Sequence, residues 1–198
     1  MAGFASPEEA ALDPMPTGIT HVVVSRRAVG ADSAIAEVEH ADHTSAVGVR
    51  QATERDRGAL HEMYRAFFAE VETPAYWGVT LRSELVEVDE ILADGLAFVA
   101  EEDAEIVGFV LARRKEGTRG LLSDIYVRPN ARRNRHGRAL ARAAADALKE
   151  RGATHITLSV HVANAPARAA YERWGFRART LTLDVPTEEL TRRLSGNG

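Results

Sequence analysis

The chain has 198 residues, of which 45% are hydrophobic and 27% charged, enough for one globular domain with a sizeable core. Without cysteine it can form no disulfide, thiolate metal site or cysteine nucleophile, and its formal net charge of -4 argues against nucleic-acid binding as its main task. No apolar run is long enough to span a membrane and the first residues lack a signal-peptide pattern, so we expect a cytoplasmic protein with no membrane or nucleic-acid partner.

Residues 1–45 differ in composition from the rest of the chain. They are rich in Ala, Pro, Gly, Asp and Glu, and only the stretch "THVVVS" has the pattern of a short strand. We therefore predict a mobile N-terminal extension over residues 1–45 and a single domain over residues 46–198. His40 and His43 lie in this extension without a completing set of ligands, so we expect no metal site.

The first half of the domain begins with a short strand, "VGVRQA", and turns helical after it. Thr53, followed three residues later by Asp56, is typical of a helix N-terminus. A helix is then indicated by apolar residues at helical spacing, namely Leu60, Met63, Tyr64, Phe67, Phe68 and Val71. Beyond the break at Pro74 and Gly78, the patterns predict a helix over 81–94, a hairpin of strands over 96–102 and 104–115, and a central strand over 121–127.

The second half alternates between helix and strand. The patterns predict a helix over 136–151, a strand over 154–162, a helix over 164–176 and a last strand over 177–185. A run of strands followed by helical crossovers indicates an α/β domain whose sheet is mixed and mostly antiparallel, with helices flanking it.

Arginine concentrates at one junction of this acidic chain, where the central strand meets the following helix. The sequence there is "VRPNARRNRHG". A helix N-terminus exposes unpaired amides and the positive end of the helix dipole, so it favours phosphate, and arginine adds charge-assisted hydrogen bonds. We therefore predict a small phosphate-bearing ligand, with a solvated arginine loop as the alternative. The candidate binding residues are Arg132, Arg133, Asn134, Arg135, His136, Gly137 and Arg138.

Two segments resemble motifs of the GNAT superfamily of N-acetyltransferases. "YVRPNARRNRHGRAL" resembles the acetyl-CoA motif, a Val-x-Pro followed by "[QR]xxGx[GA]", with Arg132 in its first position and Gly137 in its last. "NAPARAAYERWGF" resembles the later motif, with Asn164, Tyr171 and the pair Gly175-Phe176 at the family's spacing. The resemblance covers about residues 47–185 and implies a GNAT-like sheet whose fourth and fifth strands splay apart.

The resemblance also implies acetyl-CoA as co-substrate. The main chain of Ile125, Tyr126 and Val127 would pair with the pantetheine arm like a strand, and Asn164 would hold that arm or the acetyl group. Arg135 departs from the pattern because it occupies the place of the first motif glycine. A residue with a Cβ can present its amide there if its φ stays negative and its side chain swings aside.

The expected reaction is direct attack of a primary amine on the acetyl group. The resemblance makes Tyr171 the general acid that protonates the leaving thiolate, with a packing role as the alternative. Asp124, an acid in an otherwise apolar strand, is the first candidate for the general base. Glu84 on the second helix is another candidate, and a water chain to solvent is a third possibility.

The acceptor is expected to be a small cationic amine. The span from Glu70 to Asp94 is rich in acids, which would attract a cation, and Tyr76 and Trp77 could line the entrance. A solvated helix face explains the acids equally well. A protein lysine or N-terminal acetyltransferase and a non-catalytic acyl-CoA sensor remain the alternatives, and a homodimer stays open.

Overall fold

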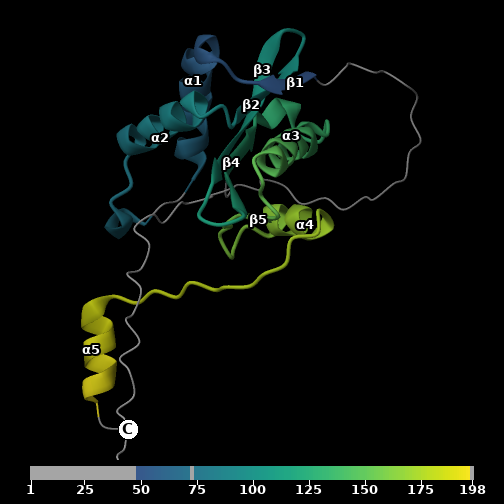
Figure 1. The fold of residues 1–198 in the computed structure, drawn as a ribbon. Coiled ribbons are helices and arrows are strands. Elements are labelled where there is room, and N and C mark those ends of the chain that lie inside the picture. Colours follow the sequence, from purple (N-terminus) through teal and green to yellow (C-terminus); the bar gives the residue numbers. More distant parts are fainter. Residues whose placement is uncertain (1–47, 72–73, 197–198) are drawn as a thin grey trace, which may run out of the picture.

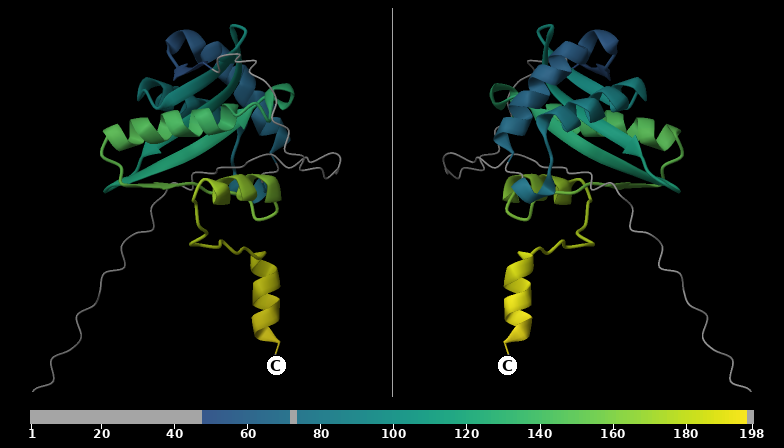
Figure 2. Two further views of the ribbon diagram at one scale, coloured as in Figure 1. Left: turned by 90° about the vertical axis from the view of Figure 1, so that its right-hand side faces the viewer. Right: turned by 90° about the vertical axis from the view of Figure 1, so that its left-hand side faces the viewer.

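The computed structural model describes residues 48–71 and 74–196, so the expected N-terminal extension and its two histidines lie outside the described residues. Helices cover both faces of a central sheet (Figures 1 and 2). The elements are β1 (Gly48–Gln51), η1 (Glu54–Asp56), α1 (Arg57–Glu70), η2 (Ala75–Trp77), α2 (Leu81–Ala93), β2 (Ala97–Glu102), β3 (Glu105–Arg114), β4 (Arg119–Val127), η3 (Pro129–Ala131), α3 (His136–Glu150), β5 (His155–Thr157), α4 (Ala165–Arg173) and α5 (Thr187–Ser195).

The described strands form one sheet in the order β1-β2-β3-β4-β5. The first four strands pair antiparallel, and β5 joins β4 in parallel after the crossover through α3. β5 pairs only with Arg119–Leu121 of β4, so the rest of β4 has no strand beside it on that edge among the described residues. The predicted α/β fold with a mixed sheet and splayed fourth and fifth strands is therefore confirmed.

The apolar stripe of α1 packs on the face of the sheet opposite to α3 (Figure 2). The ring of Phe109 on β3 stacks against Tyr64 with centroids 5.8 Å apart, and Phe67 meets Phe109 edge-on at 6.1 Å. Tyr126 on β4 completes this aromatic cluster, 5.7 Å from Phe67. Burial of such rings is a main source of stability for a domain of this size.

On the other face, α3 lies close to the sheet because two strands carry glycine under it. A Cβ on Gly120 of β4 would stand 2.7 Å from Leu148, and one on Gly108 of β3 would stand 2.8 Å from the Tyr126 carbonyl oxygen and 3.2 Å from Leu140. Both leucines are fully buried. The missing side chains therefore fix how deeply α3 sits on the sheet.

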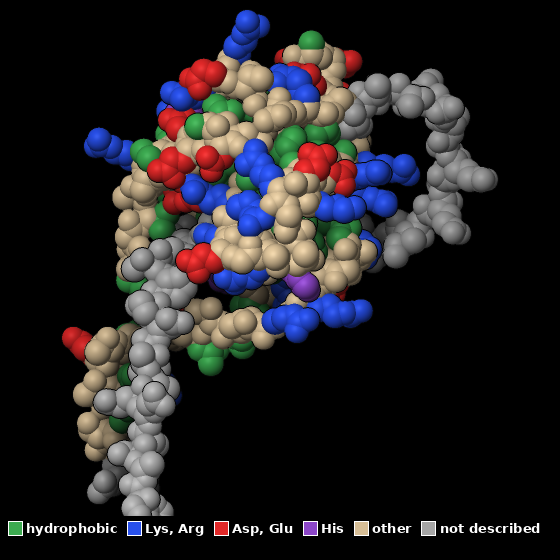
Figure 3. All heavy atoms as spheres, viewed as in Figure 1, with side chains coloured by type: hydrophobic (Ala, Val, Ile, Leu, Met, Phe, Trp, Pro, Cys, Tyr) green, Lys and Arg blue, Asp and Glu red, His purple; other side chains and the backbone are tan. Residues whose placement is uncertain are grey.

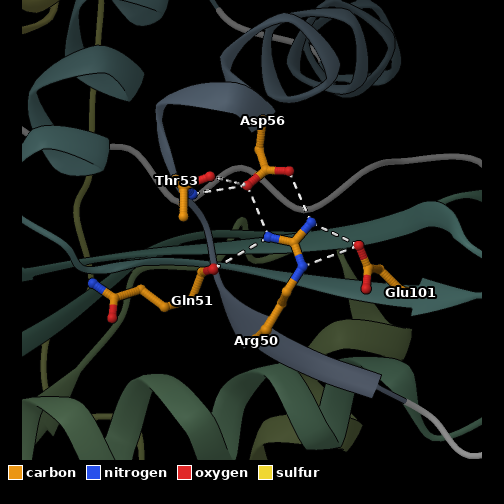
Figure 4. A network of polar contacts seen from close by, with 5 residues as sticks. All are labelled: Arg50, Gln51, Thr53, Asp56 and Glu101. Atoms are coloured by element: carbon orange, nitrogen blue, oxygen red, sulfur yellow. Dashed lines mark hydrogen bonds and ion pairs between the residues drawn. The ribbon is translucent and has the colours of Figure 1, made fainter.

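A charged network ties β1 to the start of α1 (Figure 4). Arg50 donates to both carboxylate oxygens of Asp56 at 2.8 Å and to Glu101 of β2 at 2.6 Å. The Asp56 carboxylate also accepts from the Thr53 amide and hydroxyl, at 2.8 and 2.9 Å. Thr53 is thus the predicted cap, although a short 3-10 turn precedes α1.

The predicted last strand over 177–185 does not form, and this prediction was wrong. The segment is extended, exposed and without a strand partner among the described residues, and an additional helix, α5, follows it. The predicted strand over 154–162 also shortens to His155–Thr157. A strand needs a neighbour to satisfy its backbone groups, and periodicity alone does not supply one.

We predict that Asp56→Asn destabilises the protein by about 1–2 kcal/mol at neutral pH, because it weakens charged hydrogen bonds at a buried carboxylate. The pKa of Asp56 is held well below its usual range, chiefly by the hydrogen bonds from Arg50. A lowered folded-state pKa stabilises above the unfolded pKa of about 4, and this contribution is lost as pH falls further. Urea unfolding from pH 7 to pH 3 should therefore show the gap between wild type and variant closing.

The matched control is Glu54→Gln in the same turn, where the carboxylate is exposed and pairs only with Arg57. This change should alter stability by less than about 0.5 kcal/mol. An Asp56→Asn variant as stable as the control at pH 7 would contradict a structural role for the network.

Candidate active site

Asp124 is a buried carboxyl at an irregular point of the central sheet. In the pairing of β3 with β4, Leu111 faces Asp124 and Ala112 faces Leu122, which leaves Ser123 as an extra residue in β4. Such a β-bulge bends the strand and redirects the neighbouring side chains. The Oδ1 atom of Asp124 is fully buried and accepts no hydrogen bond from a described residue. A buried acceptor without a partner is costly, so this atom is available to a ligand.

Asp124 belongs to a group of acids between the sheet and the first two helices. The Tyr64 hydroxyl on α1 donates to Glu84 of α2 at 2.6 Å. Burial raises the pKa of Asp124 well above its usual value, and the charges of Glu84 and Glu87 raise it further. Arg113 opposes this shift, but its guanidinium already pairs with Glu87 at 3.0 Å. The acids around Asp124 therefore have too little positive charge nearby to offset their own negative charge.

Glu84 is itself perturbed. Burial raises its pKa, while the hydrogen bond from Tyr64 acts in the opposite direction. The charge of Glu84 in turn raises the pKa of Asp124. The structure thus brings together both residues that the sequence proposed as the base.

Tyr171, near the end of α4, lies within the electrostatic reach of Asp124. Its side chain is buried, and its ring packs against Trp174 and Phe176 with centroids 5.6 and 5.9 Å away. Burial, assisted by the charge of Asp124, raises its pKa above the usual value for tyrosine. Among the described residues, no group accepts a hydrogen bond from its hydroxyl. The phenol therefore stays protonated at neutral pH.

Sequence reasoning missed the contribution of Tyr64 and Arg113. Tyr64 was assigned only to the apolar stripe of α1, and Arg113 only to the end of a strand. A tyrosine on a buried stripe needs a partner for its hydroxyl, and this is the signal that would have singled it out. Its partner, Glu84, lies 20 residues away on another helix, so only the fold reveals the pair.

The expected phosphate loop lies between β4 and α3. Basic side chains gather around α3 on the face shown in Figure 3. Arg132 donates to the Val127 carbonyl at 2.9 Å and to Glu70 at 2.9 Å, so its guanidinium is engaged within the protein. By contrast, the exposed side chains of Arg133, Arg135 and Arg138 form no ion pair with any residue of the described ranges.

The backbone of this loop differs from the sequence expectation at Arg135. The residue precedes α3 with a φ of 63°, in the left-handed region, rather than with a negative φ. Arg133 has a φ of 77°. Left-handed backbone costs a residue with a Cβ about 1–2 kcal/mol. The loop thus keeps the course that a glycine would take, although arginine occupies the position.

In the first turn of α3, one residue has free space beside it, and another has a buried nitrogen atom without a hydrogen-bond partner among the described residues. A Cβ added to Gly137 would meet only Val127, at 3.9 Å, so the protein itself leaves room there. His136 is fully buried, and its Nε2 lies 3.3 Å from Glu102 while its Nδ1 has no partner among the described residues. Both residues lie beside the end of β4, where Ile125 and Val127 are half-buried.

Asn164 is buried at the start of α4. Its side chain accepts a hydrogen bond from the Ala167 amide at 3.1 Å, the geometry of a helix N-cap. This cap starts the short helix on which Tyr171 lies. The structure thus gives Asn164 a positioning role that does not depend on any ligand.

Most acids of the span from Glu70 to Asp94 are paired at the surface or between elements. Glu70 accepts from Tyr126 at 3.0 Å and from Arg132 at 2.9 Å. Burial and the bond to Glu70 raise the pKa of Tyr126 to about 12, although the charge of Arg132 acts in the opposite direction. Asp89 contacts His61 at 2.7 Å, and Glu90 pairs with Arg113 at 3.1 Å. The span is therefore less of an open acidic surface than its composition indicates, and Glu84 and Glu87 are the members whose charges act on Asp124.

Within residues 48–71 and 74–196, no three His, Asp or Glu side chains gather in a way that could hold a metal ion. In the same ranges, no helix combines the length and apolar character needed to cross a membrane.

The chain belongs to the acetyltransferase (GNAT) family, whose sequence pattern matches residues 57–176. This range contains every candidate site residue described above. The family assignment confirms the resemblance seen in the two motifs and the expected enzyme class, an N-acetyltransferase.

Individual proteins show how far the similarity extends. A streptothricin acetyltransferase of Streptomyces lavendulae is 43% identical over 86 residues, but the match spans 42% of this chain and 46% of the relative. An N-acetyltransferase of Bacillus subtilis strain 168, YhfO, is 28% identical over 72% of this chain and all of the relative.

The fold has solved counterparts. The structure of AAC(6')-Iy in complex with a bisubstrate analogue, CoA-S-monomethyl-acetylneamine, superposes with a TM-score of 0.59. It covers 72% of this chain and 99% of that protein at 17% identity. At this identity the likeness concerns the fold alone.

Proposed function

We propose that the protein transfers an acetyl group from acetyl-CoA to a primary amine of a small cationic molecule. The observation that carries the proposal is the buried carboxyl of Asp124, whose pKa is raised by burial and by the charge of the half-buried Glu84, and whose own charge acts on the buried phenol of Tyr171. Asp124 lies in the part of β4 that has no β5 residue paired with it, and a donor and an acceptor could approach each other there. The partial match to a streptothricin acetyltransferase supports a small-molecule acceptor.

The described residues fit acetyl-CoA as substrate. The unpaired edge of β4 at Ile125, Tyr126 and Val127 offers main-chain groups to the amides of the pantetheine arm. The α3 N-terminus, with the loop residues Arg133 to Arg138, offers amides and unpaired guanidinium groups to the phosphates. Arg132, engaged with Glu70 and Val127, adds positive charge at the same end of the strand.

The carboxyl pair explains a preference for cations. A buried acid whose pKa is raised by burial and by like charges is stabilised in its ionised form when an ammonium group comes close. An incoming amine would satisfy Oδ1 of Asp124, the acceptor atom left without a partner. Because Asp124 is buried, this attraction is screened by salt less than that of a surface acid.

The reaction needs three proton movements, and the carboxyls and Tyr171 can account for all of them. The Asp124–Glu84 pair takes a proton from the ammonium, which frees the nitrogen lone pair to attack the acetyl carbonyl carbon. As the C–N bond forms and the C–S bond breaks, the Tyr171 hydroxyl donates to the departing sulfur. The second amine proton returns to the Tyr171 oxygen, so the net products are the amide, the free thiol and one proton. A raised pKa weakens Tyr171 as an acid but keeps it protonated.

Two other functions remain as rivals. A protein lysine or N-terminus as acceptor would use the same donor site, because the fold fixes the donor better than the acceptor. A non-catalytic acyl-CoA sensor would need the loop and β4 but neither the carboxyl pair nor a phenol close to it. The raised pKa values of Asp124, Glu84 and Tyr171 favour an enzyme.

The function is tested by a panel of amines followed through thiol release from acetyl-CoA. We expect diamines and amino sugars with a second ammonium group to react with a higher kcat/KM than monoamines of equal size or lysine peptides. Glu84→Gln should lower kcat/KM for the cationic amines by about tenfold or more, because it removes a charge from the buried pair. The matched control Glu90→Gln changes an exposed acid on the same helix and should leave this preference intact. Preferential reaction of peptides or of anionic amines would refute the acceptor class.

The variant Gly137→Ala should affect thermal stability and the affinity for acetyl-CoA differently. Alanine is favoured over glycine by about 1 kcal/mol inside a helix, and the neighbouring atoms leave room for its Cβ. We therefore expect the variant to melt at the same temperature as wild type or higher, yet to bind acetyl-CoA more weakly because the Cβ occupies space needed by a phosphate. Calorimetry of binding and thermal unfolding would measure the two effects. Unchanged affinity would mean that the phosphates lie elsewhere.

Tyr171→Phe removes only a hydroxyl. We expect kcat to fall by about 100-fold while the affinity for acetyl-CoA changes little, since the proton is needed only in the chemical step. Stopped-flow measurement of a single turnover separates this step from product release. The control Tyr126→Phe removes another buried tyrosine hydroxyl, one that is bonded to Glu70, and should keep kcat within a few-fold. Full kcat in the Tyr171 variant would make Tyr171 a packing residue.

A further inference from the structure

One arginine of the sheet contacts two acids of α2. Arg113 lies near the end of β3, and α2 packs against that strand. Its Nε lies 3.0 Å from a carboxylate oxygen of Glu87, and its Nη2 donates to Glu90 at 3.1 Å. The same Nη2 donates to the main-chain carbonyl of Glu87 at 3.4 Å. A single guanidinium thus attaches two successive turns of α2 to the sheet.

The contact between Arg113 and Glu87 is partly shielded from water. The two side chains are 24% and 30% exposed, whereas that of Glu90 is 61% exposed. The Nε atom of Arg113 is buried and donates no hydrogen bond to a described residue, so its contact with Glu87 is an ion pair without hydrogen-bond geometry. Exposed ion pairs contribute little and are screened by salt, whereas partly buried charges are screened less. The charge of Arg113 therefore acts chiefly on Glu87 and the groups around it.

The acids of α2 form a row that connects Arg113 to the candidate site. Glu84, Glu87 and Glu90 follow one another at a spacing of three residues, so they lie along one side of the helix. Arg113 contacts the second and third of these acids, and the first accepts the Tyr64 hydroxyl. No ion pair or hydrogen bond within the described residues joins Arg113 to Glu84. Arg113 can therefore act on Glu84 only through its charge and through Glu87.

The charges around this row act on both carboxyls of the candidate site. Burial raises the pKa of Asp124 and of Glu84, and the negative charge of Glu87 raises both further. The positive charge of Arg113 lowers the same two pKa values. The phenols that interact with Asp124 stay protonated because they are buried, and these are Tyr64 of α1 and Tyr171 of α4. Arg113 is thus the cation that offsets the negative charge around the two carboxyls.

We propose that Arg113 is a positioning residue of the acceptor site. By pairing with Glu87 it offsets the charge of that acid, and it thereby sets the pH above which the two carboxyls of the site, Asp124 and Glu84, take a proton from the amine. The inference rests on the proposed acetyl transfer and adds to it the group that controls its pH range. Without Arg113, three neighbouring acids would have no cation to offset them and would keep their protons to a higher pH.

The test is the pH dependence of kcat/KM for one diamine that the wild type acetylates, followed through thiol release. The free amine ionises identically in every assay, so a difference between variants belongs to the protein. In Arg113→Met the acid limb of the profile should move to higher pH by about one unit, because loss of the cation favours the protonated carboxyls. At a pH below the limb, kcat/KM should then be about tenfold lower than in the wild type, and at high pH the two should converge.

Further variants separate the effect of charge from a loss of structure. Glu87→Gln should move the acid limb to lower pH, and the double variant Arg113→Met, Glu87→Gln should return it close to the wild-type position. Arg113→Lys keeps the charge without the planar fork, so its limb should stay near that of the wild type. The matched control is Arg114→Met on the same strand. The Arg114 guanidinium bonds to the carbonyls of Gly117 and Arg151, so its loss should leave the limb in place.

The outcomes distinguish this inference from the proposed function. Acid limbs that coincide in the wild type, Arg113→Met and Glu87→Gln would overturn the role of Arg113 while acetyl transfer stands. An equal loss of kcat/KM at every pH, not relieved by Glu87→Gln, would make Arg113 only a structural contact of α2. If Arg113→Met does not fold, as circular dichroism would show, Glu87→Gln alone decides through the direction in which its limb moves. A wild type that acetylates no amine would refute the proposed function, and this inference with it.

Discussion

The burial of Asp124 in the central strand is the constraint on which the rest of the site depends. A carboxyl in an apolar sheet is costly, and the neighbouring acids Glu84 and Glu87 increase that cost. The sheet tolerates Asp124 where β4 bulges at Ser123 and parts from β5, so the carboxyl and the opening in the sheet occur together. A regular, fully paired β4 would offer neither a reason for the acid nor a place for a substrate.

The packing of α3 connects this strand to the phosphate loop. Gly108 and Gly120 let Leu140 and Leu148 approach the sheet, and this fixes the height and direction of the helix. The N-terminus of α3 therefore comes beside the end of β4, with Gly137 next to Val127. Two glycines that touch no ligand thus place the dipole of α3 where a pyrophosphate can meet it.

Features that lie within one helix or strand could be predicted from the sequence. Contacts that join two distant elements could not. The stripe of α1, the cap at Thr53 and the two family motifs each lie in a short stretch, and the structure confirms the helices and strands that they predict. The hydrogen bond from Tyr64 to Glu84 and the engagement of Arg132 with Glu70 join distant segments, so no local pattern reveals them. The strand predicted over 177–185 failed for the same reason, because its pattern says nothing about a partner.

Arg135 shows how the loop combines a backbone requirement with a charge requirement. Glycine would adopt a φ of 63° without strain, whereas arginine adopts it at a cost in backbone strain. Residues held in such a conformation are frequent at functional sites. Arg135 puts an exposed side chain at the start of α3, whereas Arg132 already pairs with Glu70. Arg135 thus gives the loop an exposed positive charge, which Arg132 does not because its guanidinium pairs with Glu70.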